Sequence, residues 1–139
     1  MKLTKKSPKL SGFTLSELLV VLVIIGILVL LALPSLMPLI SRTRGLEAKQ
    51  QLKHLHTLEK TFFFEYSRYA DDLDALGFEQ SPLVTDDPPG TANYVITIDE
   101  ASVTGFLATA TAVVDFDGDG EYNSWQIDQS GNLVETQKD

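Results

Sequence analysis

The chain has 139 residues, of which 19 are acidic and 11 basic, so its formal net charge is −8 at pH 7. This length allows one small domain and one membrane helix. Lys138 is the only basic residue from Ala70 onward, where most of the acidic residues lie. A region with this excess of acidic residues repels the phosphate backbone of nucleic acids, so the sequence argues against a nucleic-acid partner. The chain has no cysteine, so a small exported domain would need another source of stability than disulfides.

The first twelve residues form a basic leader. It carries four lysines and no acid, and it ends at Gly12, just before an apolar run that begins at Phe13. An ordinary secretory signal loses its apolar region on cleavage, whereas here that region follows the glycine and would be retained. The sequence therefore predicts a leader at residues 1–12, cleavage between Gly12 and Phe13, and export of the residues after about Leu39.

Residues 13–40 are expected to form a transmembrane and assembly helix. The stretch 18–33 is uninterrupted by polar residues and is long enough to span most of a bilayer core. Glu17 lies at its start, and an ionised carboxylate in hydrocarbon costs at least a few kcal/mol, so it needs a partner. A new α-amino group at Phe13 would supply one. Pro34 and Pro38 are expected to break or kink the helix.

Residues 12–34, GFTLSELLVVLVIIGILVLLALP, resemble the class III signal of type IV pilins and of the pseudopilins of type II secretion. The resemblance implies that a prepilin peptidase of the membrane aspartyl class removes residues 1–12 from the cytoplasmic side and N-methylates Phe13. It also implies that Glu17 pairs with the amino group of Phe13 in a neighbouring subunit, and that helical order can be lost around Pro34 and Pro38. Many pilins close their C-terminal region with a disulfide, and this chain departs from that pattern.

Residues 41–139 are expected to form the soluble head, beginning with an amphipathic helix at residues 41–69. One apolar stripe recurs there at steps of three and four residues, formed by Leu52, Leu55, Leu58, Phe62 and Tyr66. The polar residues beside its members are Lys49, Lys53, Glu59, Lys60 and Glu65. Residues 70–93 are rich in proline and acids and are predicted to form a connecting loop.

Residues 94–139 are predicted to form the sheet with its acidic loop. Strands are expected at 94–98, at 105–114 and around Trp125 and Ile127, with a fourth at 133–136. The residues expected on the inner face are Phe106, Val113, Trp125 and Ile127. The predicted fold is therefore α+β: a long N-terminal helix, half membrane and half amphipathic, packed on an antiparallel sheet of three to four strands.

The segment DFDGDGEYNSWQID, residues 115–128, is a candidate calcium loop. Asp115, Asp117 and Asp119 alternate and precede Gly120, as in the first half of an EF-hand loop. Gln126 stands where a bidentate glutamate is expected, so further ligands would come from Glu121, Asn123 or Asp128. The alternative is a plain hairpin turn, since Asp-Gly pairs favour turns. Three acids within five residues repel one another unless a cation or solvent relieves them.

Neither a phosphate-binding glycine loop nor a Ser/His/Asp constellation is evident, so no enzymatic activity is expected. The leading hypothesis is a subunit that polymerises into a type IV pilus used for adhesion, motility or surface contact. Its partners would be copies of itself, the prepilin peptidase and the inner-membrane assembly platform. It would lie in the cytoplasmic membrane as a precursor and then in an extracellular filament. The alternatives are a major-type pseudopilin in a periplasmic pseudopilus and a monomeric membrane-anchored binding domain.

Overall fold

A computed structural model describes residues 11–138, with the backbone alone for residues 34–41. The lysines of the leader lie outside the described residues. The chain divides into two compact units, Met1–Leu36 and Met37–Asp139. The expected functional boundary at residue 40 stays a prediction.

Helix α1 (Leu15–Tyr66) is the longest element and runs through both units. It continues through Pro34 and Pro38, so the expectation that these prolines break the helix is wrong for the backbone described. A proline removes its own N–H from the helical ladder, and the neighbouring residues keep theirs. A bend at the prolines stays a prediction.

The end of α1 lies three residues before the expected one. The helix ends at Tyr66, and Ser67 takes a left-handed conformation with φ of 56°. The Ser67 N–H donates to the carbonyl of Phe63 at 2.8 Å, which satisfies one of the last helical carbonyls. The chain then turns back through a short helix, α2 (Leu73–Leu76), which Asp72 caps by accepting the Asp74 N–H.

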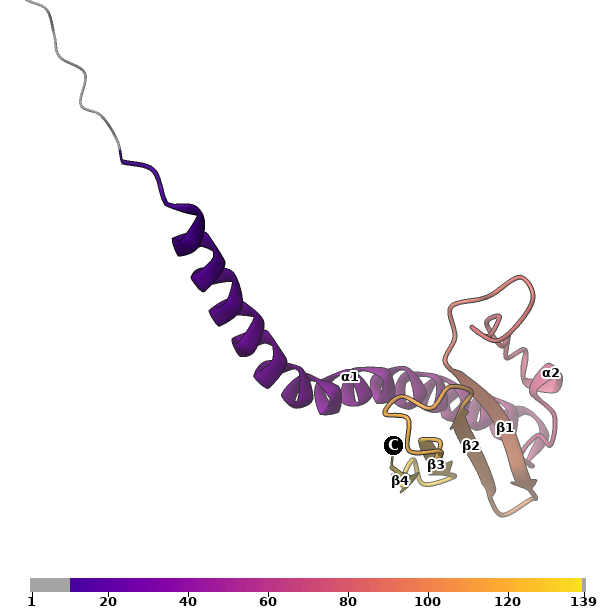
Figure 1. The fold of residues 1–139 in the computed structure, drawn as a ribbon. Coiled ribbons are helices and arrows are strands. Elements are labelled where there is room, and N and C mark those ends of the chain that lie inside the picture. The colour runs from indigo at the N-terminus through magenta and orange to yellow at the C-terminus, as the bar shows by residue number, and fades with distance from the viewer. Residues whose placement is uncertain (1–10, 139) are drawn as a thin grey trace, which may run out of the picture. The chain divides into compact units, whose positions relative to one another are not determined.

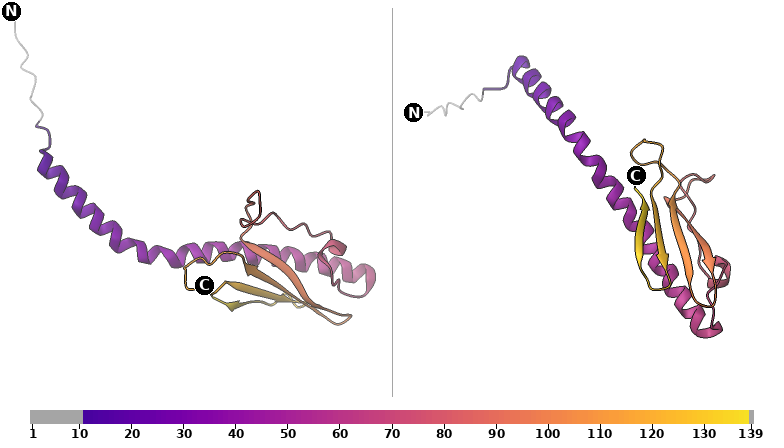
Figure 2. Two further views of the ribbon diagram at one scale, coloured as in Figure 1. Left: turned by 45° about the vertical axis from the view of Figure 1, so that its right-hand side comes forward. Right: turned by 90° about the horizontal axis from the view of Figure 1, so that it is seen from below.

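The sheet has four strands, which agrees with the three to four that the sequence predicts. They are β1 (Tyr94–Ala101), β2 (Phe106–Ala112), β3 (Ser124–Asp128) and β4 (Leu133–Gln137). Their order in space is β1-β2-β3-β4, and each pair is antiparallel, so the sheet is a simple meander (Figures 1 and 2). Consecutive strands pair through short connections, except β2 and β3, between which the acidic loop is inserted.

The core lies between the sheet and the part of α1 that follows the apolar segment (Figure 2). Ala48, Leu52 and Leu55 of α1 are completely buried. They face three alanines of β2, and these small side chains allow the helix to approach the sheet closely. The remaining core members are Phe78, Tyr94, Ile96, Phe106 and Ile127. This packing confirms the α+β fold.

Two expectations about burial are wrong. Tyr66 is 55% exposed, because the helix ends beside it and the sheet does not cover it, whereas Leu58 and Phe62 are half-buried. Val113 lies one residue beyond β2 and is not part of the core. The inward side chains of β2 occupy even-numbered positions from Phe106 to Ala112, so an odd-numbered residue points to the opposite face.

Candidate assembly site

The apolar part of α1 has no cover within its own unit. The stretch Leu15–Leu33 is, by length and composition, able to cross a membrane, and it is the one such stretch among the described residues. Its large side chains are all exposed, for example Leu18 at 56% and Leu30 at 69%. Such a continuous apolar surface on an otherwise acidic chain requires lipid or another protein surface around it.

Glu17 closes the start of this helix. One carboxylate oxygen, Oε2, accepts the backbone N–H of Thr14 at 2.7 Å and the Thr14 hydroxyl at 2.9 Å. The Thr14 hydroxyl oxygen in turn accepts the Glu17 N–H at 3.3 Å. This reciprocal arrangement is a capping box, which satisfies backbone donors that the first helical turn leaves unpaired.

The capping role of Glu17 was absent from the sequence-based interpretation. Its signal is the spacing Thr-x-x-Glu directly before an apolar run, in the segment TLSE. The cap explains how the isolated chain tolerates this carboxylate. Both bonds from Thr14 go to the same carboxylate oxygen, Oε2. Glu17 can therefore cap the helix and still pair with a second group through its other oxygen.

The predicted cleavage site is accessible. Residues 11–14 are not helical, Phe13 is 81% exposed, and a Cβ placed on Gly12 would meet no atom within 4 Å. Phe13 and Glu17 also line a shallow hollow of about 370 Å³ together with Ser16, Val20 and Val21. Phe13, predicted for cleavage, and Glu17, predicted for assembly, therefore lie on one side of the helix start.

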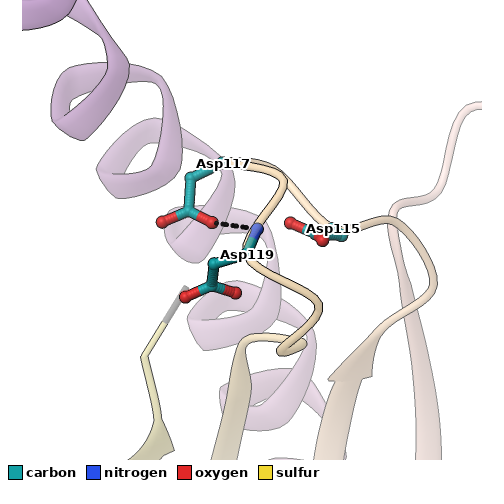
Figure 3. A group of neighbouring side chains, drawn as sticks. All are labelled: Asp115, Asp117 and Asp119. Carbon is teal, nitrogen blue, oxygen red and sulfur yellow. Dashed lines mark hydrogen bonds between the residues drawn. The ribbon is translucent and has the colours of Figure 1, made fainter.

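Three of the six candidate calcium ligands converge in the loop between β2 and β3 (Figure 3). Carboxylate oxygens of Asp115, Asp117 and Asp119 lie within 4.8 Å of one another. Asp115 also organises the loop backbone: its two oxygens accept the N–H groups of Gly118 at 2.6 Å and Gly120 at 2.8 Å. Both glycines have positive φ, at 84° and 91°, a conformation that other residues rarely adopt.

The other three candidates have different roles. The Asn123 side chain is buried, and its Oδ1 accepts the Tyr94 hydroxyl at 2.8 Å and the Trp125 indole N–H at 2.7 Å. Asp128 accepts two N–H groups of the turn between β3 and β4, at the far end of β3. The Glu121 carboxylate accepts the Gln137 amide. The chain thus brings together the first half of the predicted set, which fits a hard cation only if backbone carbonyls or water complete the shell.

Backbone hydrogen bonds hold the pKa of Asp115 below its ordinary value, those from Gly120 and Gly118 most strongly, and desolvation opposes them. Because the folded-state pKa is depressed, this contribution to stability is present above the unfolded pKa of about 3.9 and is lost as the pH falls through the folded value. The loop is therefore closed at neutral pH by its own amide groups.

Calcium binding at Asp115, Asp117 and Asp119 stays a prediction, and chelation tests it. If Ca²⁺ binds only the folded chain, a concentration 100-fold above Kd adds about 2.7 kcal/mol of stability. We expect EGTA to lower the melting temperature of the full chain in detergent, and we expect Asp117→Ala to abolish that difference. Identical melting curves with and without EGTA in the unsubstituted protein would leave the plain turn as the correct interpretation.

Glu59 is a buried charge that the sequence-based interpretation placed among the polar residues of the helix surface. Its side chain is completely buried, and its Oε2 accepts the Ala70 N–H at 3.0 Å. Its Oε1 has no hydrogen-bond partner among the described residues. Burial raises the pKa of Glu59, the hydrogen bond from Ala70 opposes the rise, and the charge of Asp71 adds to it. Glu59 thus ties the chain reversal after α1 back to the helix.

We expect Glu59→Gln to remove a pH dependence from the stability of the head. Because the folded-state pKa is raised, the contribution of Glu59 is fully present below its unfolded pKa of about 4.3 and is lost as the pH rises through the folded value. The wild type should therefore lose stability relative to Glu59→Gln over that interval.

Glutamine keeps an acceptor for the Ala70 N–H, whereas Glu59→Ala leaves that N–H without an acceptor and should cost about 1–3 kcal/mol of stability. Denaturant unfolding followed by the fluorescence of Trp125, the single tryptophan, measures both. A pH-independent difference between wild type and Glu59→Gln would contradict this role.

Comparison with known proteins places the N-terminal region in a described family. Residues 8–33 match a family model described as the prokaryotic N-terminal methylation motif. The chain is 42% identical over 78 residues to the type IV major pilin protein PilA of Myxococcus xanthus, a match that covers 56% of this chain and 36% of that protein. Two fimbrial proteins of Pseudomonas aeruginosa are each 30% identical over 128 residues, covering 81% of this chain and 82% of theirs.

Proposed function

This chain belongs to the type IV pilin family, and on that premise we propose that it is a structural subunit that polymerises into a pilus filament after loss of residues 1–12. The observation that carries the proposal is the combination of a fully exposed apolar helix, Leu15–Leu33, with a single carboxylate at its start. A membrane anchor alone needs the apolar helix, but it does not need Glu17 inside it.

The proposed assembly begins with processing at the membrane. Residues 11–14 offer a non-helical, exposed segment to a prepilin peptidase, and cleavage after Gly12 frees the α-amino group of Phe13. In the filament, that amino group in one copy pairs with the Glu17 carboxylate of a neighbour. The charged pair offsets the cost of placing either group among apolar side chains. Phe13 and Glu17 line one hollow at the start of the helix, and this closeness of the two residues supports the pairing.

A pseudopilus subunit is the second candidate. It would use the same helix, the same cleavage and the same pairing, and it would differ in filament length and place. The similarity to proteins named as a major pilin and as fimbrial proteins favours the surface pilus. For the pilus, the precursor would reside in the cytoplasmic membrane and the assembled copies outside the cell. The assembly platform would be a further partner.

Electron microscopy of sheared surface material from cells that express this chain tests the proposal, with mass spectrometry of any fibres. The proposal predicts long fibres whose main component begins at a methylated Phe13. Processed protein held in the membrane without surface fibres would contradict the pilus and favour the pseudopilus. Protein that retains residues 1–12 and forms no fibres would favour a membrane-anchored monomer.

A further inference from the structure

Four basic residues form a line along α1, which we call the basic line: Arg42, Lys49, Lys53 and Lys60. They are separated by seven, four and seven residues, so at about 100° per residue they lie within about 20° of a common line. None of them has an acid three or four positions away. The helix itself therefore offers none of them a stabilising ion pair.

The other two basic residues between the leader and Ala70 are Arg44 on α1 and Arg68 two residues past its end. Arg44 has Glu47 three residues later on the helix. Each also lies over an aromatic ring of its own chain: the Arg44 guanidinium is 4.5 Å from the centroid of the Phe116 ring. The basic line is thus distinguished from the remaining bases by its lack of a partner on the helix, and Arg42, Lys53 and Lys60 are all exposed.

A hollow of about 420 Å³ lies beside the basic line, between α1 and the β3–β4 hairpin. Arg42, Gly45, Lys49, Trp125 and Glu135 are among its lining residues. The Lys49 ammonium lies 4.1 Å from the centroid of a Trp125 ring, which holds it at the rim of the hollow. A partner side chain that enters here meets two cations, an indole and the Glu135 carboxylate.

Gly45 is buried in the wall of this hollow, beside Trp125. A Cβ at position 45 would lie 3.5 Å from Trp125 Nε1, an ordinary contact distance, so the packing of this chain alone does not require glycine there. A glycine inside a helix costs about 0.5–1 kcal/mol relative to alanine. Glycine at position 45 therefore lowers helix stability without relieving a close contact among the described residues.

The acidic surface of a second copy has the matching chemistry. Asp117, Asp119 and Glu121 are exposed on the loop between β2 and β3, and the head carries no described base after Arg68 except Lys138. From Arg42 to Lys60 the basic line spans 18 residues, or about 27 Å along the axis. The acidic loop of a neighbour that is displaced along that axis can therefore still contact one residue of the basic line. A contact between two different surfaces of identical chains gives an open filament whenever the rotation between copies does not close into a ring.

We propose that, in the assembled fibre, the basic line of one copy binds the acidic loop, residues 115–121, of a second copy. The inference rests on the proposed polymerisation and names one contact within it, between the soluble heads of two copies. It is independent of the pairing between Glu17 and Phe13, which concerns the apolar unit alone. An anionic polymer bound along an exposed basic line is the competing occupant.

Cysteine cross-linking tests the contact directly, because the chain has no cysteine of its own. Lys53→Cys combined with Asp119→Cys should give a ladder of covalent multimers when intact fibres are treated with a short bismaleimide. The matched control is Glu65→Cys with Asp119→Cys, since Glu65 is also exposed on α1 but lies about 140° around the helix axis from Lys60. Either substitution alone should give no ladder. Fibres in which the control pair cross-links and the Lys53 pair does not would overturn the proposal.

Charge reversal gives a second measure that does not depend on a cross-linker. Lys53→Glu with Lys60→Glu should lower fibre yield at least tenfold, and adding Asp119→Lys with Glu121→Lys should restore it. Arg68→Glu, off the basic line, should leave the yield unchanged. Normal yield from the Lys53→Glu, Lys60→Glu variant would overturn the contact and leave the basic line open to an anionic polymer. Absence of fibres from the unsubstituted chain would instead overturn the proposed function itself.

Discussion

Glu17→Gln is expected to abolish fibres while leaving the protein processed and held in the membrane. Glutamine at this position can still accept the Thr14 N–H, so the helix start is retained. It cannot pair with an α-amino group as a charge. A cation left unpaired in hydrocarbon costs about 2.5–3.5 kcal/mol at the helix centre, which corresponds to a loss of assembly of roughly a hundredfold. The measurement is the amount of pilin in the sheared fraction relative to the membrane fraction.

Thr14→Ala is the matched control for Glu17→Gln. It removes the threonine hydroxyl that bonds to Glu17 in both directions, and it leaves the carboxylate charge in place. Loss of an N-cap costs about 1 kcal/mol of helix stability. We therefore expect fibres from Thr14→Ala in reduced but readily measured yield. Normal fibre yield from Glu17→Gln would contradict the charge pairing and would leave helix capping as the role of Glu17.

Gly12→Val is expected to leave the chain at its precursor mass. The structure shows free space around Gly12, so a larger side chain meets nothing in this chain and cannot act by disturbing its fold. Any effect must arise where a peptidase holds the residue before the cut. Because cleavage creates the amino group on Phe13, Gly12→Val should also lose fibres. Mass spectrometry of the membrane fraction measures the processed share directly.

Gly26→Ala is the control for Gly12→Val. Gly26 also has no atom within 4 Å of its Cβ position, and it lies inside α1, where alanine favours the helix. This variant should be processed as the unsubstituted chain is. A protein of mature mass from Gly12→Val would argue against a prepilin peptidase as the processing enzyme.

The sequence predicted the head well where periodicity carried the information. Leu52 and Leu55 lie on the buried stripe, and the four strands follow from runs of Thr, Val and Ala between turn residues. Phe106 and Ile127 face inward as expected. Each of these conclusions depends on local sequence pattern alone, and a single amino-acid sequence contains that pattern in full.

The failures concern contacts between residues that are distant in the chain or effects of where an element ends. Helical spacing alone placed Glu59 among polar residues, whereas its burial depends on the chain reversal that brings Ala70 over it. Asn123 was a candidate ligand, and its engagement by Tyr94 and Trp125 is set by how β1 and β3 pack together. Tyr66 continues the apolar stripe in the sequence, but α1 extends beyond the sheet, so its last residue is not covered.

A cryo-electron microscopy reconstruction of the fibres tests the central claim most directly, because it places both charged groups of the proposed pair. The account predicts that the Glu17 carboxylate of one copy lies within about 4 Å of the α-amino nitrogen of Phe13 in a neighbour, a distance at which such groups form an ion pair. A reconstruction in which Glu17 contacts only Thr14 of its own chain, with every Phe13 amino group elsewhere, would contradict it.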